Sequence, residues 1–157
     1  LITRFKYEHT PELASLLAAC LATAADQAQM PTPQCFVPVP LSAQRLAERG
    51  YDQAWELARR LGRQLQRPAR CDLIRRRFDG LRQASLTRAQ RLSNLQGAFD
   101  VDPKGRADLA GQHLALVDDV MTTGATAQEV TRALRAAGAA RVDLWVVART
   151  PAPDAPQ

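Results

Sequence analysis

Residues 114–126, LALVDDVMTTGAT, decide the fold class of this chain. Four apolar residues run into two adjacent aspartates, and a turn of small, hydroxyl-bearing residues follows them. This order predicts a buried strand that ends at Val117, then a loop, then a helix. Ligands of open α/β folds bind beyond the carboxyl ends of such strands. The two aspartates and the loop are therefore expected together at a ligand-binding edge of a sheet.

The rest of the chain alternates between helical and strand patterns. Asp52 is predicted to cap a helix that Pro68 stops, and Thr126 with Glu129 forms a capping box that starts another. Residues 79–93 are predicted to form a long loop that merges into a short helix. The predicted helices cover 11–27, 52–66 and 126–138, and the predicted strands cover 34–40, 71–78, 97–102, 113–117 and 141–150, the last of them buried.

Length and composition agree with this alternation. The chain has 157 residues, of which 46% are hydrophobic, as expected for a globular domain with its own core. It holds no apolar run near the ~20 residues of a membrane span. We therefore predict a single α/β domain over 1–150, with a mostly parallel, twisted sheet flanked by helices, and a disordered tail over 151–157.

The positive charge of the chain is concentrated in one segment. Residues 59–91 contain eleven arginines against Asp72 and Asp79, whereas the rest of the chain has a net negative charge, and the whole chain carries +5. Such a segment is expected to bind an anionic partner, namely a phosphorylated small molecule, a nucleic acid, or both. For the arginines at 59, 60, 63 and 67, a solvated helix face is an equally simple interpretation.

Cysteine and histidine positions do not indicate a metal site. Cys20, Cys35 and Cys71 are far apart, no CxxC pair occurs, and His9 and His113 have no partner at metal-ligand spacing. Reduced cysteines of a cytoplasmic protein are therefore expected. The chain begins with leucine rather than methionine, so we expect it to be part of a longer protein.

The loop over 122–126 has the properties of a phosphate-binding site. Backbone N–H groups at the start of a helix attract anions, and Gly124 allows the backbone to approach a ligand closely. Asp118 and Asp119 would repel phosphate, but they suit a ligand that also offers hydroxyl groups or a metal ion. A ribose 5-phosphate meets both conditions, whereas the glycine-rich motifs of the two common nucleotide loops are absent. By themselves, these residues equally fit a helix cap with a solvated carboxylate.

The whole pattern of 114–126 resembles the phosphoribosyl pyrophosphate signature of type I phosphoribosyltransferases. Two other segments narrow the resemblance, namely VPVPLSAQRLAERGYDQAWELARRL at 37–61 and RQASLTRAQRLSNLQGAF at 82–99. Together with FKY at 5–7, they are similar to the ComF (ComFC/GntX) family of phosphoribosyltransferase-like proteins, which is linked to bacterial competence. Relatives in that family usually begin with a cysteine-rich zinc ribbon, which this sequence lacks.

The resemblance implies a Mg²⁺-dependent sugar-transfer site. Asp118 and Asp119 would hold the ribose hydroxyls, directly or through Mg²⁺. Arg82, Arg88 and Arg91 would belong to a mobile lid over the pyrophosphate. Gln53 and Asn94 recur in the resembling segments and would shape the site by hydrogen bonds. The 5-phosphate loop would consist of Met121, Thr122, Thr123, Gly124, Ala125 and Thr126. The pyrophosphate loop would consist of Leu41 and Ser42 with Arg45 or Arg49, although a surface position of Arg49 is an equal alternative.

Three functions remain open from the sequence. The first is an enzyme that transfers phosphoribose to an acceptor that the sequence does not specify. The second is a non-catalytic DNA-uptake factor with a pocket that senses phosphoribosyl pyrophosphate, in which Arg75, Arg76, Arg77 and Arg91 contact single-stranded DNA. The third is a phosphate-binding regulator without either activity. Trp55 is expected in the core rather than against a base. The sequence leaves the oligomeric state open, with a homodimer as one alternative because type I relatives often form one.

Overall fold

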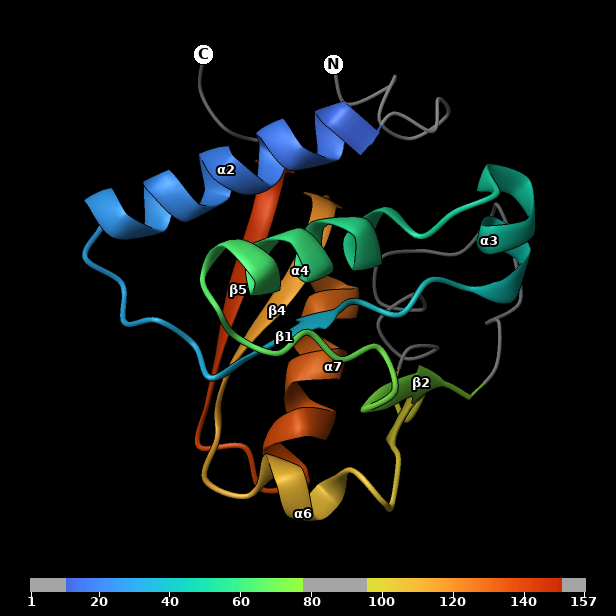
Figure 1. Cartoon of the computed structure of the whole chain (residues 1–157). Helices are drawn as coiled ribbons and strands as arrows, with labels where there is room; N and C mark the ends of the chain where they lie inside the picture. The colour runs from blue at the N-terminus through green and yellow to red at the C-terminus, as the bar shows by residue number, and fades with distance from the viewer. Residues whose placement is uncertain (1–10, 78–95, 151–157) are drawn as a thin grey trace, which may run out of the picture.

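The computed structural model describes residues 11–77 and 96–150. A parallel sheet with the strand order β1–β4–β5 lies at its centre (Figure 1). Residues 114–117 in the middle strand are fully buried, and the predicted α/β class with a parallel sheet is confirmed. β5 lies at the sheet edge and buries only Trp145, so the prediction of a buried final strand was wrong. The strands are β1 (Cys35–Pro38), β4 (His113–Met121) and β5 (Arg141–Arg149).

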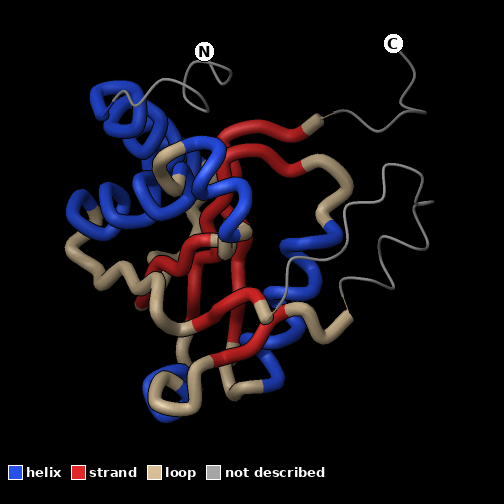
Figure 2. The backbone as a smooth tube through the Cα atoms, turned by 90° about the vertical axis from the view of Figure 1, so that its right-hand side faces the viewer, coloured by secondary structure: helices blue, strands red, loops and turns tan. Residues whose placement is uncertain are grey.

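Helices cover both faces of this sheet (Figures 1 and 2). They are α2 (Pro11–Gln27), α4 (Gln53–Gln64) and α7 (Ala125–Ala136). Because side chains alternate along a strand, β4 contributes to a separate core on each face. Ala115 and Val117 pack in the core beneath α2 and α4, whereas Leu114 and Leu116 pack in the core beneath α7. The direction of each side chain of β4 therefore decides which helix it meets.

A smaller, antiparallel sheet packs beside α7. It pairs β2 (Ile74–Arg76) with β3 (Phe99–Val101), and a short helix, α6 (Arg106–Leu109), follows. The sequence predicted both strands over longer ranges, 71–78 and 97–102, but not their antiparallel pairing, because pairing joins segments that lie far apart in the chain. The apolar residues of both strands are buried in the core beneath α7. The hairpin is thereby fixed on the α7 side of the main sheet.

The start of α4 confirms the prediction, and the start of α7 does not. Asp52 caps α4 by accepting a hydrogen bond from the Trp55 amide at 3.0 Å. The predicted capping box of Thr126 and Glu129 was wrong, because Gly124 already occupies the N-cap position and no side chain caps α7. The left-handed backbone of Gly124, with φ +78°, turns the chain into the helix earlier than the predicted cap would.

A seven-residue helix, α3 (Ala43–Arg49), was not predicted. Its N-cap is Ser42, whose hydroxyl accepts a hydrogen bond from the Arg45 amide at 3.2 Å. None of its residues is buried, so its sequence lacks the apolar periodicity by which helices are recognised. Within 11–77 and 96–150, no helix combines the length and the apolarity needed to cross a bilayer.

A hydrogen-bonded cluster closes the amino end of the main sheet. Asp143 on β5 lies 2.8 Å from His113 Nε2 on β4 and accepts a hydrogen bond from Arg141 Nε at 2.8 Å. Burial raises the pKa of Asp143, but the hydrogen bonds from Arg141 and His113 outweigh it, so the pKa lies below its usual 3.8. This cluster joins two neighbouring strands at the end opposite to the predicted site.

Candidate functional site

Strand β4 continues through both aspartates to Met121. The prediction that it ends at Val117 was wrong, because β5 pairs with it as far as the register Met121 with Arg149. Pairing with β1 on its other side does end at Val117, which lies opposite Pro38. The last hydrogen bond between these segments runs from the Val39 amide to the Val117 carbonyl at 2.8 Å. Beyond Val117, β4 is therefore no longer paired with β1, and a ligand can approach this edge of the strand.

The strand conformation sends the two aspartates toward different faces of the sheet. Asp119 shares its face with Val117 and α4, and Asp118 shares its face with Leu116 and α7. Both nevertheless line the same cavity, because this cavity lies at the carboxyl end of the sheet rather than on one face. The phosphate-binding loop lines it too. The acids and the loop are therefore neighbours, as the sequence predicted.

The cavity has a volume of ≈ 280 Å³. This is just below the usual range of pockets for small molecules. It brings together predicted site residues from two separate segments, 41–49 and 118–126. They are Leu41, Ser42, Arg45, Arg49, Asp118, Asp119, Met121, Thr122, Thr123, Gly124, Ala125 and Thr126. The lining also includes Asp52, Gln53 and Arg76, which the sequence did not assign to the phosphate or ribose groups.

Gly124 shapes the loop between β4 and α7. With φ +78°, it adopts a backbone conformation that other residues rarely take, and a Cβ atom there would lie 3.3 Å from the Met121 sulfur. Ala125 begins the helix, and its amide donates to the Thr123 hydroxyl at 3.4 Å. The first amides of α7 have no partners within their own helix, and the helix dipole adds positive potential there. The loop can therefore bind an anion.

The acidic pair is held by backbone amides and by an arginine. Asp118 accepts a hydrogen bond from the Asp119 amide at 2.8 Å, and Asp119 accepts one from the Val120 amide at 2.7 Å. The second oxygen of Asp119 lies 3.9 Å from Arg49 Nη1, and both side chains are mostly buried. Arg49 therefore belongs to the cavity, and its alternative assignment to the surface was wrong.

Gln53 positions Arg49. It is 1% exposed, and its Oε1 accepts a hydrogen bond from Arg49 Nη1 at 2.8 Å. The sequence left this residue without a definite role, although a signal was present. Gln53 precedes Leu57 and Leu61 at helical spacing, so it occupies an apolar stripe where a glutamine needs a partner. That partner comes from α3, which the sequence did not predict.

Asp52 adds a third carboxylate to the cavity lining. Burial raises its pKa above the usual value, although the amides of Trp55 and Ala54 donate hydrogen bonds that lower it. The nearby carboxylate of Asp119 also raises the pKa of Asp52. Against these three acids, the lining holds Arg45, Arg49 and Arg76. A ligand in this cavity meets groups of both signs.

Among the described residues, the structure separates the members of the predicted nucleic-acid patch. Arg75 and Arg77 are exposed, and Arg77 forms an ion pair with Asp100. Arg76 instead lines the cavity with the acidic pair, because neighbouring residues of a strand face opposite sides. Arg82, Arg88, Arg91 and Asn94, which were predicted to serve the lid, the patch and the site, lie outside the described residues.

The acidic pair fits a magnesium ion that is shared with a ligand. Within the described ranges, no group of three or more His, Cys, Asp or Glu side chains is placed to hold a metal ion by itself. Mg²⁺ does not need such a group, because it usually keeps several waters and binds one or two carboxylates together with substrate phosphates. Asp118 and Asp119 would supply those carboxylates, and neither is a soft ligand that would favour another metal.

The fold is that of the type I phosphoribosyltransferases. The structure is similar to glutamine phosphoribosylpyrophosphate amidotransferase from B. subtilis, with a TM-score of 0.61 and 17% identity over 99% of this chain and 32% of that one. It is also similar to purine phosphoribosyltransferase from Pyrococcus horikoshii, with a TM-score of 0.50 and 19% identity over 88% of this chain and 77% of that one. At these identities the similarity establishes the fold alone.

Sequence similarity adds the family. Residues 46–157 match the family described as phosphoribosyl transferase domain, and the chain belongs to it. It is 34% identical to Competence protein F of Haemophilus influenzae and 32% identical to DNA utilization protein YhgH of Escherichia coli K12, over 95% and 96% of this chain. It is 29% identical to Competence protein ComFC of Bacillus subtilis over 95% of this chain. These similarities confirm the predicted resemblance to the competence family. The chain spans 66%, 66% and 58% of the lengths of these three relatives.

Proposed function

We propose that this domain binds phosphoribosyl pyrophosphate with Mg²⁺ and transfers the phosphoribosyl group to an acceptor, in a process connected with DNA uptake or use. One observation carries the proposal, namely that a single cavity joins the acidic pair of β4 to the loop that starts α7. The relatives named for competence and for DNA utilization support the connection with DNA. All three cysteines are free thiols, which supports a reducing, cytoplasmic location.

The proposed binding mode gives each part of the ligand its own group of residues. The 5-phosphate binds the loop over 122–126, where the amides of the α7 start and the helix dipole favour an anion. The ribose hydroxyls donate hydrogen bonds to Asp118, which is more exposed than Asp119. The pyrophosphate binds beside Leu41 and Ser42, at the point where the chain leaves β1.

The proposed reaction breaks the bond between ribose C1 and the pyrophosphate oxygen, and the electron pair leaves with pyrophosphate. A nucleophile of the acceptor then forms the new bond to C1. Positive charge develops on the sugar ring during this exchange, and the carboxylates of Asp118 and Asp119 stabilise it. These two residues would also hold Mg²⁺ together with ligand oxygens, and the ion would neutralise charge on the departing pyrophosphate. Arg49 and Gln53 keep Asp119 in position.

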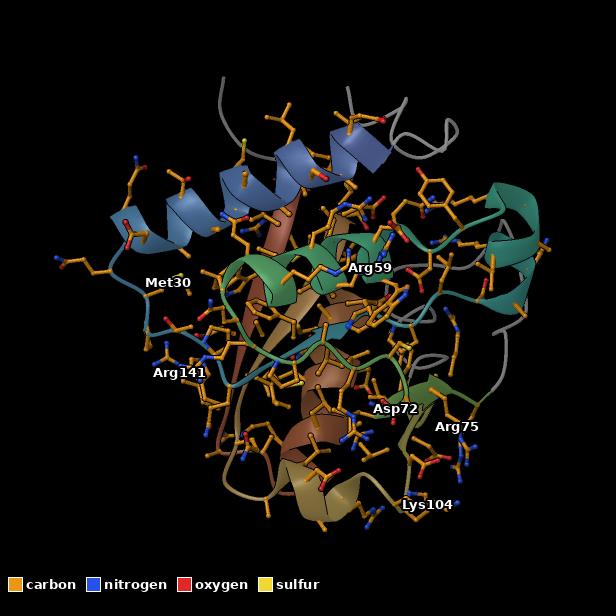
Figure 3. All side chains as sticks on the ribbon, viewed as in Figure 1. Met30, Arg59, Asp72, Arg75, Lys104 and Arg141 are labelled. Carbon is orange, nitrogen blue, oxygen red and sulfur yellow. The ribbon has the colours of Figure 1, made fainter. Side chains whose placement is uncertain are left out.

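The double variant Asp118→Asn with Asp119→Asn tests the proposal. We expect it to lose Mg²⁺-dependent binding of phosphoribosyl pyrophosphate in calorimetry while it remains folded by circular dichroism. The matched control is Asp72→Asn, at the exposed aspartate labelled in Figure 3. Asp72 is not among the residues that line the cavity, so its substitution should leave affinity unchanged. A folded double variant with wild-type affinity would contradict the assignment. Release of pyrophosphate that accelerates with one nucleobase would establish transfer, and binding without release would indicate a sensor instead.

A second surface favours contact with single-stranded DNA as an additional candidate function. A shallow pocket of ≈ 540 Å³, here called the α4 groove, lies along α4 and the turn after it. Its lining consists of Trp55, Arg59, Gly62, Arg63, Gln66, Arg67 and Ala69. The lining has no acidic side chain, and Arg63 and Arg67 form no ion pair with any other described residue.

The α4 groove combines the two features that unspecific binding of single strands needs, which are positive charge and an aromatic ring. Trp55 packs partly against the core, as predicted, but it also lines this groove. The interpretation of the arginines at 59, 60, 63 and 67 as a solvated helix face is correct only for some of them. Arg59 donates to Glu56 at 3.0 Å, and Arg60 is bound by Glu56 and by Ser15 of α2. The charge available to a phosphate backbone therefore comes chiefly from Arg63 and Arg67.

Fluorescence anisotropy of a labelled single strand tests this second function. We expect binding that weakens steeply between low salt and about 0.15 M salt, because arginines release counterions from the phosphates. The double variant Arg63→Ala with Arg67→Ala should lose most of this binding. Removal of two arginines from α7, Arg132→Ala with Arg135→Ala, is the matched control for net charge. Equal losses in both double variants would assign the binding to net charge and contradict a site in the α4 groove.

A further inference from the structure

The β2–β3 hairpin separates three consecutive arginines by strand geometry. The register places Arg75 opposite Asp100 and Arg76 opposite Phe99. Because directly opposed residues of an antiparallel pair lie on the same face, Arg75 belongs to the face with Asp100. Figure 3 shows the Arg75 side chain at the outer side of the hairpin. Arg76 belongs to the other face, with Phe99.

That other face is the apolar face of the hairpin. Ile74, Phe99 and Val101 are buried there, at 3%, 5% and 6% exposure, in the core beneath α7. Arg76 is the last residue of β2 and stands beside them, with its guanidinium carbon 5.6 Å from the centre of the Phe99 ring. A charge on an apolar face is costly, and an apolar residue would serve packing better. The position of Arg76 therefore calls for a reason other than packing.

The reason that the structure offers is the cavity. Arg76 lines it together with the acidic pair and the loop at the start of α7. Arg49 reaches the cavity from the α3–α4 side of the sheet, where it already holds Gln53 and Asp119. Arg76 reaches it from the hairpin, on the α7 side. The two arginines therefore bring positive charge to the cavity from opposite faces of the sheet.

We propose that Arg76 is a ligand-binding residue that contacts a phosphate group of the phosphorylated sugar in this cavity. The proposal rests on the proposed function and extends it by one residue. A guanidinium group binds phosphate through two parallel hydrogen bonds, a geometry that lysine does not reproduce. The guanidinium lies over the Phe99 ring in a cation–π contact, which restricts the side chain and so reduces the freedom that binding would otherwise remove.

Calorimetry on three variants tests this role. Arg76→Ala removes the side chain, and Arg76→Met removes the charge but keeps an apolar chain over Phe99, so that a packing defect is separated from loss of charge. Arg75→Ala, the neighbouring arginine on the outer face, is the matched control. We expect at least about tenfold weaker binding of phosphoribosyl pyrophosphate with Mg²⁺ for both Arg76 variants, since hydrogen bonds to charged groups contribute strongly. The control should stay within about twofold of the wild type.

Two smaller probes identify the phosphate group concerned. Weaker binding of ribose 5-phosphate in Arg76→Met assigns Arg76 to the 5-phosphate, and weaker binding of inorganic pyrophosphate assigns it to the pyrophosphate. Either result supports the proposal. Wild-type affinity of folded Arg76→Met for all three ligands overturns it and leaves the proposed function intact. A wild-type protein that binds none of the three ligands overturns the proposed function and this inference together.

Discussion

The substitution Gly124→Ala tests whether the backbone of the loop between β4 and α7 binds phosphate. Gly124 has φ +78°, and an alanine in this left-handed conformation costs about 1–2 kcal/mol. Alanine also lowers the entropy of the unfolded chain, which offsets about 0.4–1 kcal/mol of that cost. The added Cβ meets the Met121 sulfur at 3.3 Å, so the methionine or the loop must shift by a few tenths of an ångström. We expect a net loss of about 1 kcal/mol in the free energy of unfolding, the small difference between those two effects.

Gly111→Ala provides the matched control. Gly111 has φ +72°, nearly the same conformation, but a Cβ atom there would meet nothing within 4 Å, and the residue lies outside the cavity lining. Urea denaturation should show a similar loss of stability for both variants. Calorimetry with ribose 5-phosphate should show weaker binding for Gly124→Ala alone, because only that substitution disturbs the amides that begin α7. Equal affinities in the two variants would refute the role of this loop.

Three other perturbations test the remaining parts of the structure. Asp52→Ala should lower the free energy of unfolding in urea by about 1 kcal/mol, because it removes the cap of α4. Arg49→Gln should lower it by about 2 kcal/mol, less than the ~3–5 kcal/mol for a fully buried pair, because both partners keep some exposure. Arg141 and His113 lower the pKa of Asp143 in the folded protein against the effect of burial. The stability that ionised Asp143 contributes is therefore complete above pH 3.8, the usual pKa. This stability is lost as the pH falls through the lower pKa of the folded protein. Asp143→Asn should therefore be less stable than the wild type at neutral pH, and acid titration should show this difference shrinking below pH 3.8.

The sequence predicted the elements whose signal is local. The apolar stripe of α4, its cap at Asp52 and the buried run at 114–117 each appear within a few neighbouring residues, and the structure confirms them. The acidic pair and the small loop after it were recognisable for the same reason. Patterns of this kind reflect preferences of a helix, a strand or a turn, and they do not depend on which other segment packs against them.

The parts that sequence reasoning missed depend on contacts between distant segments. β4 continues through Met121 because β5 pairs with it there, and no residue of 114–121 alone indicates that partner. The sequence analysis assigned Arg75 and Arg76 to the same nucleic-acid patch, but the register of β2 with β3 places them on opposite faces of the hairpin. Gln53 needed α3 to supply its arginine.

The sequence by itself therefore determined that this chain forms an α/β fold with a parallel sheet, and that an acidic pair and an anion-binding loop lie at one edge of that sheet. Only the tertiary structure decided which arginines join them, because a side chain's direction follows from strand register and helix packing. Arg49 reaches the acidic pair from one face of the sheet, and Arg76 lines the same cavity from the other. Both positions arise from long-range pairing, which local periodicity does not encode.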